Sequence, residues 1–221
     1  MMKKDVIFFD LDGTLTDSQE GIVRSVIHAL QTLGRSVPDE HALRSFIGPP
    51  LKDSFREVCG LDEAATLQAV EIYRARYAAT GLFENRVYDG VEEMLGALKD
   101  AGYTLGVATS KPELYSEKIL DHFGLIKYFD FIYGATLDYK RVTKTDVIAH
   151  ALQSSGFDTQ RERVVMIGDR QHDMEGARAN GIFALGILYG YGSRAELEAA
   201  GADLICTDTG AVLRFLLRHL A

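Results

Sequence analysis

Residues 6–16 read VIFFDLDGTLT, and this stretch decides the fold. Its first four residues are apolar and favour extended structure, so they predict a buried strand. Two carboxylates, Asp10 and Asp12, follow directly, and Gly13 allows a tight turn after them. Ligands of open α/β sheets bind at the carboxyl ends of the strands, where both acids would lie. Two such close acids repel each other unless a cation or a shared proton relieves them, and their oxygens suit Mg²⁺. The alternative is an ordinary strand with an Asp-Gly turn.

The composition bounds the class of protein. With 221 residues, 47% of them hydrophobic, the chain can form one large domain or a core with a smaller one. No apolar run approaches a membrane span, and no signal-peptide segment precedes residue 6. The formal charge of −8 argues against a nucleic-acid partner. We therefore expect a cytoplasmic protein that binds neither a membrane nor a nucleic-acid polymer, with Cys59 and Cys206 as reduced thiols.

The order of predicted elements divides the chain into two parts. Residues 17–87 contain four predicted helices and no predicted strand. From residue 88 onward, helices alternate with short apolar runs at 104–108, 131–133, 164–167, 182–187 and 203–206. This alternation predicts an α/β fold, in which a Rossmann-like parallel sheet carries helices on both faces. We expect residues 1–16 and 88–221 to form that core and residues 17–87 to form an α-helical insert.

Two later stretches place further polar side chains at strand ends. The strand expected at 104–108 leads into Thr109, Ser110 and Lys111, followed by an expected helix from Pro112. Hydroxyl groups and the N–H groups of a new helix suit a phosphate, although a plain helix cap would use the same residues.

Residues 164–173 read VVMIGDRQHD, so that a second apolar strand also ends in an acid. Asp169 ends the strand, and Asp173 follows four residues later on the expected helix. This spacing lets both carboxylates face one bound cation. The simpler alternative is an aspartate that caps the helix.

Together these stretches resemble the haloacid dehalogenase superfamily in its phosphatase form, and the resemblance covers nearly the whole chain. It implies that Asp10 attacks phosphorus to form an aspartyl-phosphate, while Asp12 protonates the leaving oxygen and later deprotonates water. It also implies that Thr109 binds the transferring phosphoryl group, with Ser110 beside it. Dehalogenating members lack the second acid, so Asp12 argues against that activity.

The resemblance also implies a phosphate-binding lysine and a metal. The lysine is Lys144, but the family often has Lys-Pro-x-Pro where this chain reads Lys-Thr-Asp-Val, so Lys140 and Arg141 remain alternatives. The metal is Mg²⁺, for which the expected ligands are Asp10, the backbone carbonyl of Asp12, Asp169, and Asp173 directly or through water.

The helical insert at 17–87 resembles the cap of a subgroup that includes phosphoglycolate phosphatases, nucleotidases and β-phosphoglucomutase. Caps in that subgroup close over the site and set substrate choice. The FIGPPL stretch at 46–51 resembles the corresponding stretch of the phosphoglycolate phosphatase and 5′-nucleotidase members. It implies that Phe46, Gly48, Pro49 and Pro50 influence substrate specificity.

We therefore expect Mg²⁺-dependent hydrolysis of a small phosphorylated metabolite, either phosphoglycolate or a nucleoside 5′-monophosphate, by a monomer or homodimer. The alternatives are a sugar-phosphate mutase of the β-phosphoglucomutase type and a regulatory protein that has kept the fold without turnover.

Overall fold

The computed structural model describes residues 5–138, 140–157, 159 and 163–219, and the chain divides into two compact units. We call Met1–Thr16 with Val87–Ala221 the sheet unit and Asp17–Arg86 the helical unit. The chain crosses between them through two short paired strands, β2 (Thr16–Asp17) and β3 (Arg86–Val87). Residues 1–4 and 220–221 of the predicted core lie outside the described residues.

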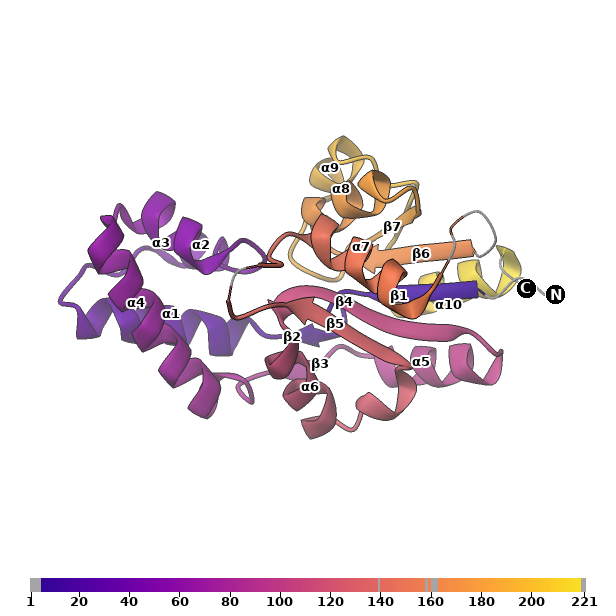
Figure 1. The fold of residues 1–221 in the computed structure, drawn as a ribbon, viewed down its shortest axis with the longest axis horizontal. Coiled ribbons are helices and arrows are strands. Elements are labelled where there is room, and N and C mark those ends of the chain that lie inside the picture. Colours follow the sequence, from indigo (N-terminus) through magenta and orange to yellow (C-terminus); the bar gives the residue numbers. More distant parts are fainter. Residues whose placement is uncertain (1–4, 139, 158, 160–162, 220–221) are drawn as a thin grey trace. The chain divides into compact units, whose positions relative to one another are not determined.

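Six parallel strands form the main sheet of the sheet unit, in the order β5-β4-β1-β6-β7-β8 (Figure 1). They are β1 (Asp5–Phe9), β4 (Thr104–Pro112), β5 (Phe131–Ala135), β6 (Arg163–Gly168), β7 (Phe183–Ile187) and β8 (Leu204–Cys206). The predicted α/β fold with a parallel sheet is therefore confirmed. The central strand β1 is the apolar run of residues 6–9, and all four of its side chains are fully buried.

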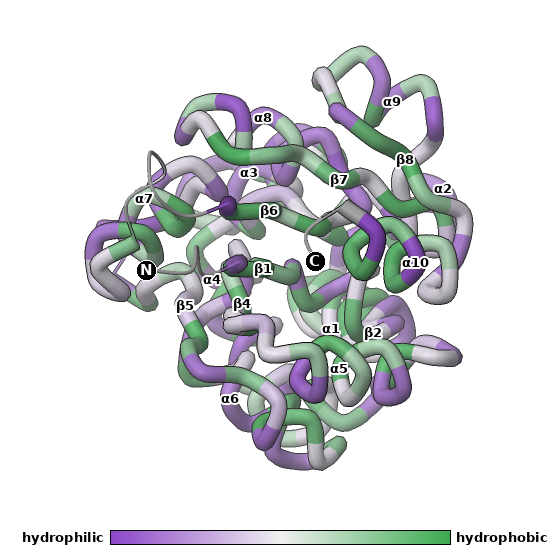
Figure 2. The backbone as a smooth tube through the Cα atoms, turned by 90° about the vertical axis from the view of Figure 1, so that its right-hand side faces the viewer, coloured by the Kyte–Doolittle hydropathy of each residue, from purple (hydrophilic) through white to green (hydrophobic). Residues whose placement is uncertain are grey.

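Helices cover both faces of this sheet (Figures 1 and 2). Because side chains alternate along a strand, Val6 and Phe8 of β1 face one side and join a core with α7 (Lys144–Ser155), α8 (Gln171–Ala179) and α9 (Arg194–Ala199). Phe9 faces the other side, where its ring lies 6.2 Å from that of Phe129. That side carries α5 (Val91–Asp100), α6 (Glu113–His122), the short 3₁₀-helix η2 (Ile126–Tyr128) and α10 (Thr209–His219).

Strand β4 is longer than the sequence indicates, and the predicted end at residue 108 is wrong. The strand continues to Pro112, which pairs with Ala135 of β5 after a register shift beyond Thr109. Such a shift re-aims side chains without ending the strand. As a result, Ser110 and Lys111 belong to the strand rather than to a helix start, and the following helix begins at Glu113.

The helical unit contains four α-helices and a π-helical turn within its described residues. These are α1 (Gln19–Thr32), α2 (Glu40–Arg44), α3 (Leu51–Cys59), α4 (Glu63–Arg76) and η1 (Tyr77–Gly81). Side chains of Asp39 and Asp62 cap α2 and α4 by accepting backbone N–H groups, as aspartates before helices commonly do. Aromatic pairs form much of its core, including Phe46 with Phe55 at 5.0 Å between ring centroids.

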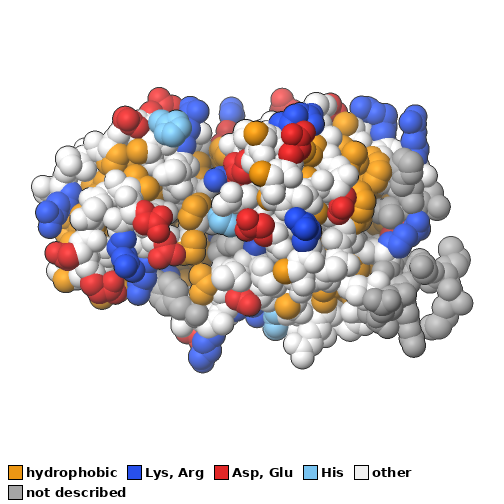
Figure 3. All heavy atoms as spheres, turned by 90° about the horizontal axis from the view of Figure 1, so that it is seen from above, with side chains coloured by type: hydrophobic (Ala, Val, Ile, Leu, Met, Phe, Trp, Pro, Cys, Tyr) orange, Lys and Arg blue, Asp and Glu red, His pale blue; other side chains and the backbone are white. Residues whose placement is uncertain are grey.

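Figure 3 shows acidic and basic side chains interspersed over the viewed face. Across the described parts of the chain, none of the helices has the length and apolar character needed to span a bilayer. Cys59 in the helical unit and Cys206 in the sheet unit are both free thiols, as expected.

Candidate active site

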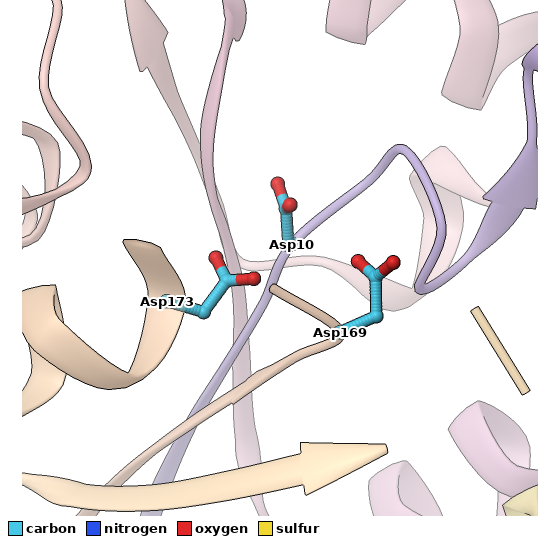
Figure 4. A group of neighbouring side chains, drawn as sticks. All are labelled: Asp10, Asp169 and Asp173. Atoms are coloured by element: carbon cyan, nitrogen blue, oxygen red, sulfur yellow. The ribbon is translucent and has the colours of Figure 1, made fainter. Parts of the chain in front are cut away.

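Three carboxylates meet at the carboxyl ends of two neighbouring strands. Asp10 follows β1, Asp169 follows β6, and Asp173 lies in the first turn of α8. The backbone N–H of Asp10 donates to the carbonyl of Ile167 at 2.9 Å, which holds the two strand ends in register. One oxygen from each carboxylate lies within 4.8 Å of the others, and the three side chains are neighbours (Figure 4). The geometry matches that of a site for a bound cation.

Lys144 places a buried ammonium group among these carboxylates. It is the first residue of α7, and its Nζ lies 2.7 Å from Asp10 Oδ1 and 2.8 Å from Asp173 Oδ1. The same Nζ donates to the carbonyl of Ala108 at 3.0 Å. Burial alone would lower the pKa of Lys144, but the two carboxylates outweigh it and raise the pKa, so the side chain stays charged.

Burial and neighbouring charge raise the pKa values of two of the three carboxylates. Burial is the main cause that raises the pKa of Asp169 well above its ordinary value, and the charges of Asp173 and Asp10 add to it. The pKa of Asp10 is also raised, mainly by burial and further by Asp173, although Lys144 opposes the shift. Asp10 and Asp169 resist ionisation mainly because they are buried and further because neighbouring carboxylates are charged, and a divalent cation would favour their ionised forms.

Asp12 is not one of these three clustered carboxylates, and it pairs with a different lysine, Lys111. Its Oδ2 is 2.6 Å from the Nζ of Lys111, which reaches it from β4. The hydroxyl of Thr109 is buried near Asp10 and accepts the backbone N–H of Lys111 at 3.2 Å. Ser110, between Thr109 and Lys111, is half-buried. The predicted acids and Thr109 are thus brought to one edge of the sheet, together with Lys111, whose pairing with Asp12 the sequence analysis did not predict.

The two alternatives to Lys144 lie elsewhere. Lys140 is 85% exposed and pairs with Asp138 at 3.0 Å. Arg141 binds Glu113 at 2.9 Å and donates to the carbonyl of Gly134 at 2.8 Å, so it ties its own loop to β5 and α6. Of the three candidates, only Lys144 contacts the site carboxylates through an ion pair within the described structure.

A loop after β7 forms a wall of the site that the sequence analysis missed. Residues 189–192 read YGYG, and the backbone N–H of Tyr191 donates to Asp169 Oδ2 at 2.7 Å. A Cβ atom on Gly192 would overlap the carbonyl oxygen of Asp169, so only glycine permits this approach. Alternating glycines directly after a strand end were the signal in the sequence.

Two glycines of the predicted motifs have steric roles of the same kind. Gly13 has a φ of 84°, and a Cβ there would overlap the carboxylate of Asp169. A Cβ on Gly168 would overlap the side chain of Asp173. The hydroxyl of Thr14 donates to Asp169 Oδ1 at 3.3 Å. The hydroxyl of Thr14 therefore helps to hold one of the site carboxylates in place.

The predicted specificity residues all lie in the helical unit, between α2 and α3. Phe46 is 3% exposed and packs on Phe55, so it belongs to the core of that unit. Gly48 is exposed and has a φ of 107°, and Pro50 is an exposed residue at the start of α3. Pro49, between them, is half-buried.

Comparison with known proteins identifies the family. Residues 7–187, most of the chain, match the model of the haloacid dehalogenase-like hydrolases. The chain belongs to this family. The match confirms the family predicted from the motifs around Asp10, Thr109 and Asp169. Relatives named 5′-nucleotidase and phosphatase show that the chain is an enzyme of the phosphatase class.

Individual relatives extend over nearly all of this hydrolase. A 5′-nucleotidase of Pseudomonas aeruginosa is 48% identical over 213 residues, which cover 96% of each chain. The tyrosine-protein kinase PtkA of Mycobacterium tuberculosis is 45% identical over 207 residues, covering 94% of this chain and 69% of that protein. The crystal structure of a predicted phosphatase from Clostridium acetobutylicum aligns with a TM-score of 0.92 and 45% identity, covering 98% of this chain and 99% of that one.

Proposed function

We propose that this hydrolase is a Mg²⁺-dependent phosphatase of nucleoside 5′-monophosphates, with phosphoglycolate as the second candidate substrate, acting through an aspartyl-phosphate on Asp10. The observation that carries the proposal is the set of three buried carboxylates on two strand ends with Lys144 between them. The 48% identical relative named 5′-nucleotidase supports the choice of substrate. The relatives favour hydrolysis over the mutase alternative.

The donor set of the site fits Mg²⁺. It consists of oxygen atoms only, and the four acids Asp10, Asp12, Asp169 and Asp173 face two lysines, Lys111 and Lys144. The negative charge therefore exceeds the positive charge that these lysines bring, which is the condition that a hard divalent cation relieves. Asp10, Asp169 and the backbone carbonyl of Asp12 would hold the ion, with Asp173 behind them, and when bound it supplies charge stabilisation for the phosphoryl oxygens.

The side chains then divide the reaction into two displacements at phosphorus. An oxygen of Asp10 bonds to phosphorus while the ester P–O bond breaks, and Asp12 gives a proton to the departing alcohol. In the second displacement a water oxygen bonds to phosphorus, the bond from phosphorus to Asp10 breaks, and Asp12 takes a proton from that water. Thr109 and Lys144 bind phosphoryl oxygens throughout.

The helical unit is the proposed source of substrate choice. The side chains assembled at the site handle the phosphoryl group, the metal and the bridging oxygen, which every phosphate monoester shares. The leaving group must be recognised by other residues. We therefore assign recognition to residues 17–87 as a cap, and specifically to the exposed turn around Gly48, Pro49 and Pro50.

The experiment is an assay of the purified chain on nucleoside 5′-monophosphates, phosphoglycolate, glucose 1-phosphate and p-nitrophenyl phosphate, first with EDTA and then with Mg²⁺ or Ca²⁺. We expect no turnover in EDTA, recovery with Mg²⁺, little recovery with Ca²⁺, and the highest kcat/KM for a nucleotide. Asp169→Ala should cost more activity than Asp173→Ala. Full activity in EDTA would contradict the metal requirement, and a higher kcat/KM for phosphoglycolate would reverse the order of the substrates.

Because one relative is named a tyrosine-protein kinase, the same protein is also incubated with ATP and a tyrosine-containing peptide. We expect phosphate release and no phosphotyrosine. Phosphotyrosine formation without hydrolysis of any ester would contradict the proposed function.

A further inference from the structure

The ion pair between Lys111 and Asp12 is a built feature of the site. Lys111 Nζ lies 2.6 Å from Asp12 Oδ2, and only 5% of the lysine side chain and 15% of the aspartate side chain are exposed. Burial of a lysine is unfavourable unless its charge is compensated. The pair also bridges two strand ends, since Asp12 follows β1 and Lys111 lies near the end of β4. Lys111 lies within the stretch of β4 where the register shifts, between Thr109 and Pro112.

The two buried lysines of the site serve different acids. Lys144 binds Asp10 and Asp173, which are a proposed nucleophile and a proposed metal-site acid. Lys111 instead binds Asp12, the proposed proton donor. A general positive field at the site needs only one of these arrangements. The separate pairing indicates that Asp12 is oriented by a lysine of its own, independently of Lys144.

The pair leaves one oxygen of Asp12 available. Oδ2 is held by Lys111, whereas Oδ1 is buried and has no hydrogen-bond partner in the described part of the chain. Buried oxygens without a partner are rare in folded proteins, and each needs an explanation. Proton exchange, first with a leaving alcohol and then with water, would explain why this oxygen has no protein partner.

We propose that Lys111 is a positioning residue for Asp12, which fixes that carboxylate by Oδ2 so that Oδ1 carries the proton. This inference rests on the proposed function. In the first displacement, the proton passes from Oδ1 to the ester oxygen as the bond from phosphorus to that oxygen breaks. The negative charge left on Asp12 develops next to the ammonium of Lys111, which stabilises it. In the second displacement, Oδ1 receives a proton from the attacking water.

The test uses kcat/KM, because this parameter covers only the steps through the first bond cleavage. When the departing alcohol is a weak acid, its oxygen needs the proton from Asp12 as it leaves; when the departing alcohol is much more acidic, as p-nitrophenol is, it does not. Lys111→Met removes the charge and keeps an unbranched side chain. We expect it to lower kcat/KM by about tenfold to a hundredfold for an alkyl phosphate and by less than about threefold for p-nitrophenyl phosphate.

The matched control is Lys99→Met, which removes the lysine from a Lys–Asp pair with Asp130, outside the site residues. This change should leave kcat/KM unchanged for both esters. Thermal unfolding shows whether Lys111→Met is folded, and Lys111→Gln replaces it if it is not. An equal loss for both esters would overturn the proposal, because it would show that Lys111 acts on the phosphoryl group or on stability.

A double-mutant cycle with Asp12→Asn and phenyl phosphate shows whether Lys111 acts through Asp12. In the Asp12→Asn protein, the added Lys111→Met change should alter kcat/KM less than twofold. A further tenfold loss there would overturn the proposal in favour of a lysine that contacts the substrate itself. If the unmodified chain hydrolyses none of these esters, the proposed function has failed; if it hydrolyses them and the two variants act independently, only the role of Lys111 has failed.

Discussion

The sheet unit and the helical unit bury different kinds of side chain. Every charged residue that is buried in the described structure lies in the sheet unit: Asp10, Lys111, Lys144, Asp169 and Asp173. The buried residues of the helical unit are apolar, aromatic or hydroxyl-bearing, and its charges pair at or near the surface. Buried charges are costly, so a fold retains them where chemistry requires them. This difference agrees with the proposal that the sheet unit carries out the reaction and the helical unit recognises the leaving group.

The largest expected effect of a single change lies at Asp10, the proposed nucleophile. Asp10→Asn keeps the shape of the side chain and removes the attacking oxygen's charge. We expect kcat to fall by at least about 10³-fold while the far-ultraviolet circular dichroism spectrum is unchanged. Residual activity within tenfold of the unmodified chain would reject Asp10 as the attacking group.

A second prediction concerns the glycines that let the chain approach Asp169. Gly192→Ala places a methyl group where it overlaps the Asp169 carbonyl oxygen, so the loop or the carboxylate must move. A displacement of about 1 Å can reduce the rate about 100-fold, and we expect a kcat/KM loss of that order.

Gly96→Ala is the matched control. Gly96 lies inside α5, and its added methyl group would meet only Tyr128, at 3.9 Å. It should keep activity and gain about 0.5–1 kcal/mol of unfolding free energy, because alanine favours the helix. Equal activity of both variants would show that the loop does not position Asp169.

A third prediction tests whether the helical unit sets substrate choice. Replacing Pro49 and Pro50 by alanine makes the turn before α3 less rigid, so more entropy is lost on binding. We expect kcat/KM for a nucleotide to fall several-fold relative to that for p-nitrophenyl phosphate. Pro38→Ala, another proline of the same unit, should leave this ratio unchanged. A uniform loss on all esters would assign the turn to stability or closure.

The smallest expected effect concerns stability of the helical unit. Glu84 accepts hydrogen bonds from Arg76 at 2.8 and 3.0 Å and from Arg24 at 3.0 Å. The bonds from Arg76 lower the pKa of Glu84, against the opposing effect of burial, and Arg24 adds to the lowering. A lowered carboxylate pKa stabilises the fold above the ordinary glutamate pKa, and the stabilisation is lost as pH falls through the folded value.

Glu84→Gln should therefore reduce the unfolding free energy at pH 7 by about 1 kcal/mol, and the difference from the unmodified chain should shrink in acid. Denaturant titrations at several pH values measure this. Glu92→Gln breaks a pair whose partners are about 60% exposed, and it should have a smaller effect. A difference that grows in acid would contradict the assignment.

Local patterns in the sequence predicted the strands and the acids that follow them. The apolar runs before Asp10 and Asp169 were sufficient, because burial on both faces of a parallel sheet leaves a continuous hydrophobic signal. The continuation of β4 through Lys111 was missed, since it depends on pairing with β5, a strand about twenty residues away. For the same reason, neither the pairing of Lys111 with Asp12 nor the approach of Tyr191 to Asp169 could be read locally.

The central claim, that Asp10 carries the phosphoryl group, can be tested directly by trapping. Borohydride reduces an acyl-phosphate, so adding it during turnover of a good substrate with Mg²⁺ converts a phosphorylated aspartate into homoserine. Mass spectrometry of the peptides then locates the change. The account predicts homoserine at position 10 only, formed in the presence of substrate and absent without it. Reduction of a different carboxylate would contradict it. So would an unmodified Asp10 in a protein that is turning over and whose phosphorylated form has been shown to accumulate.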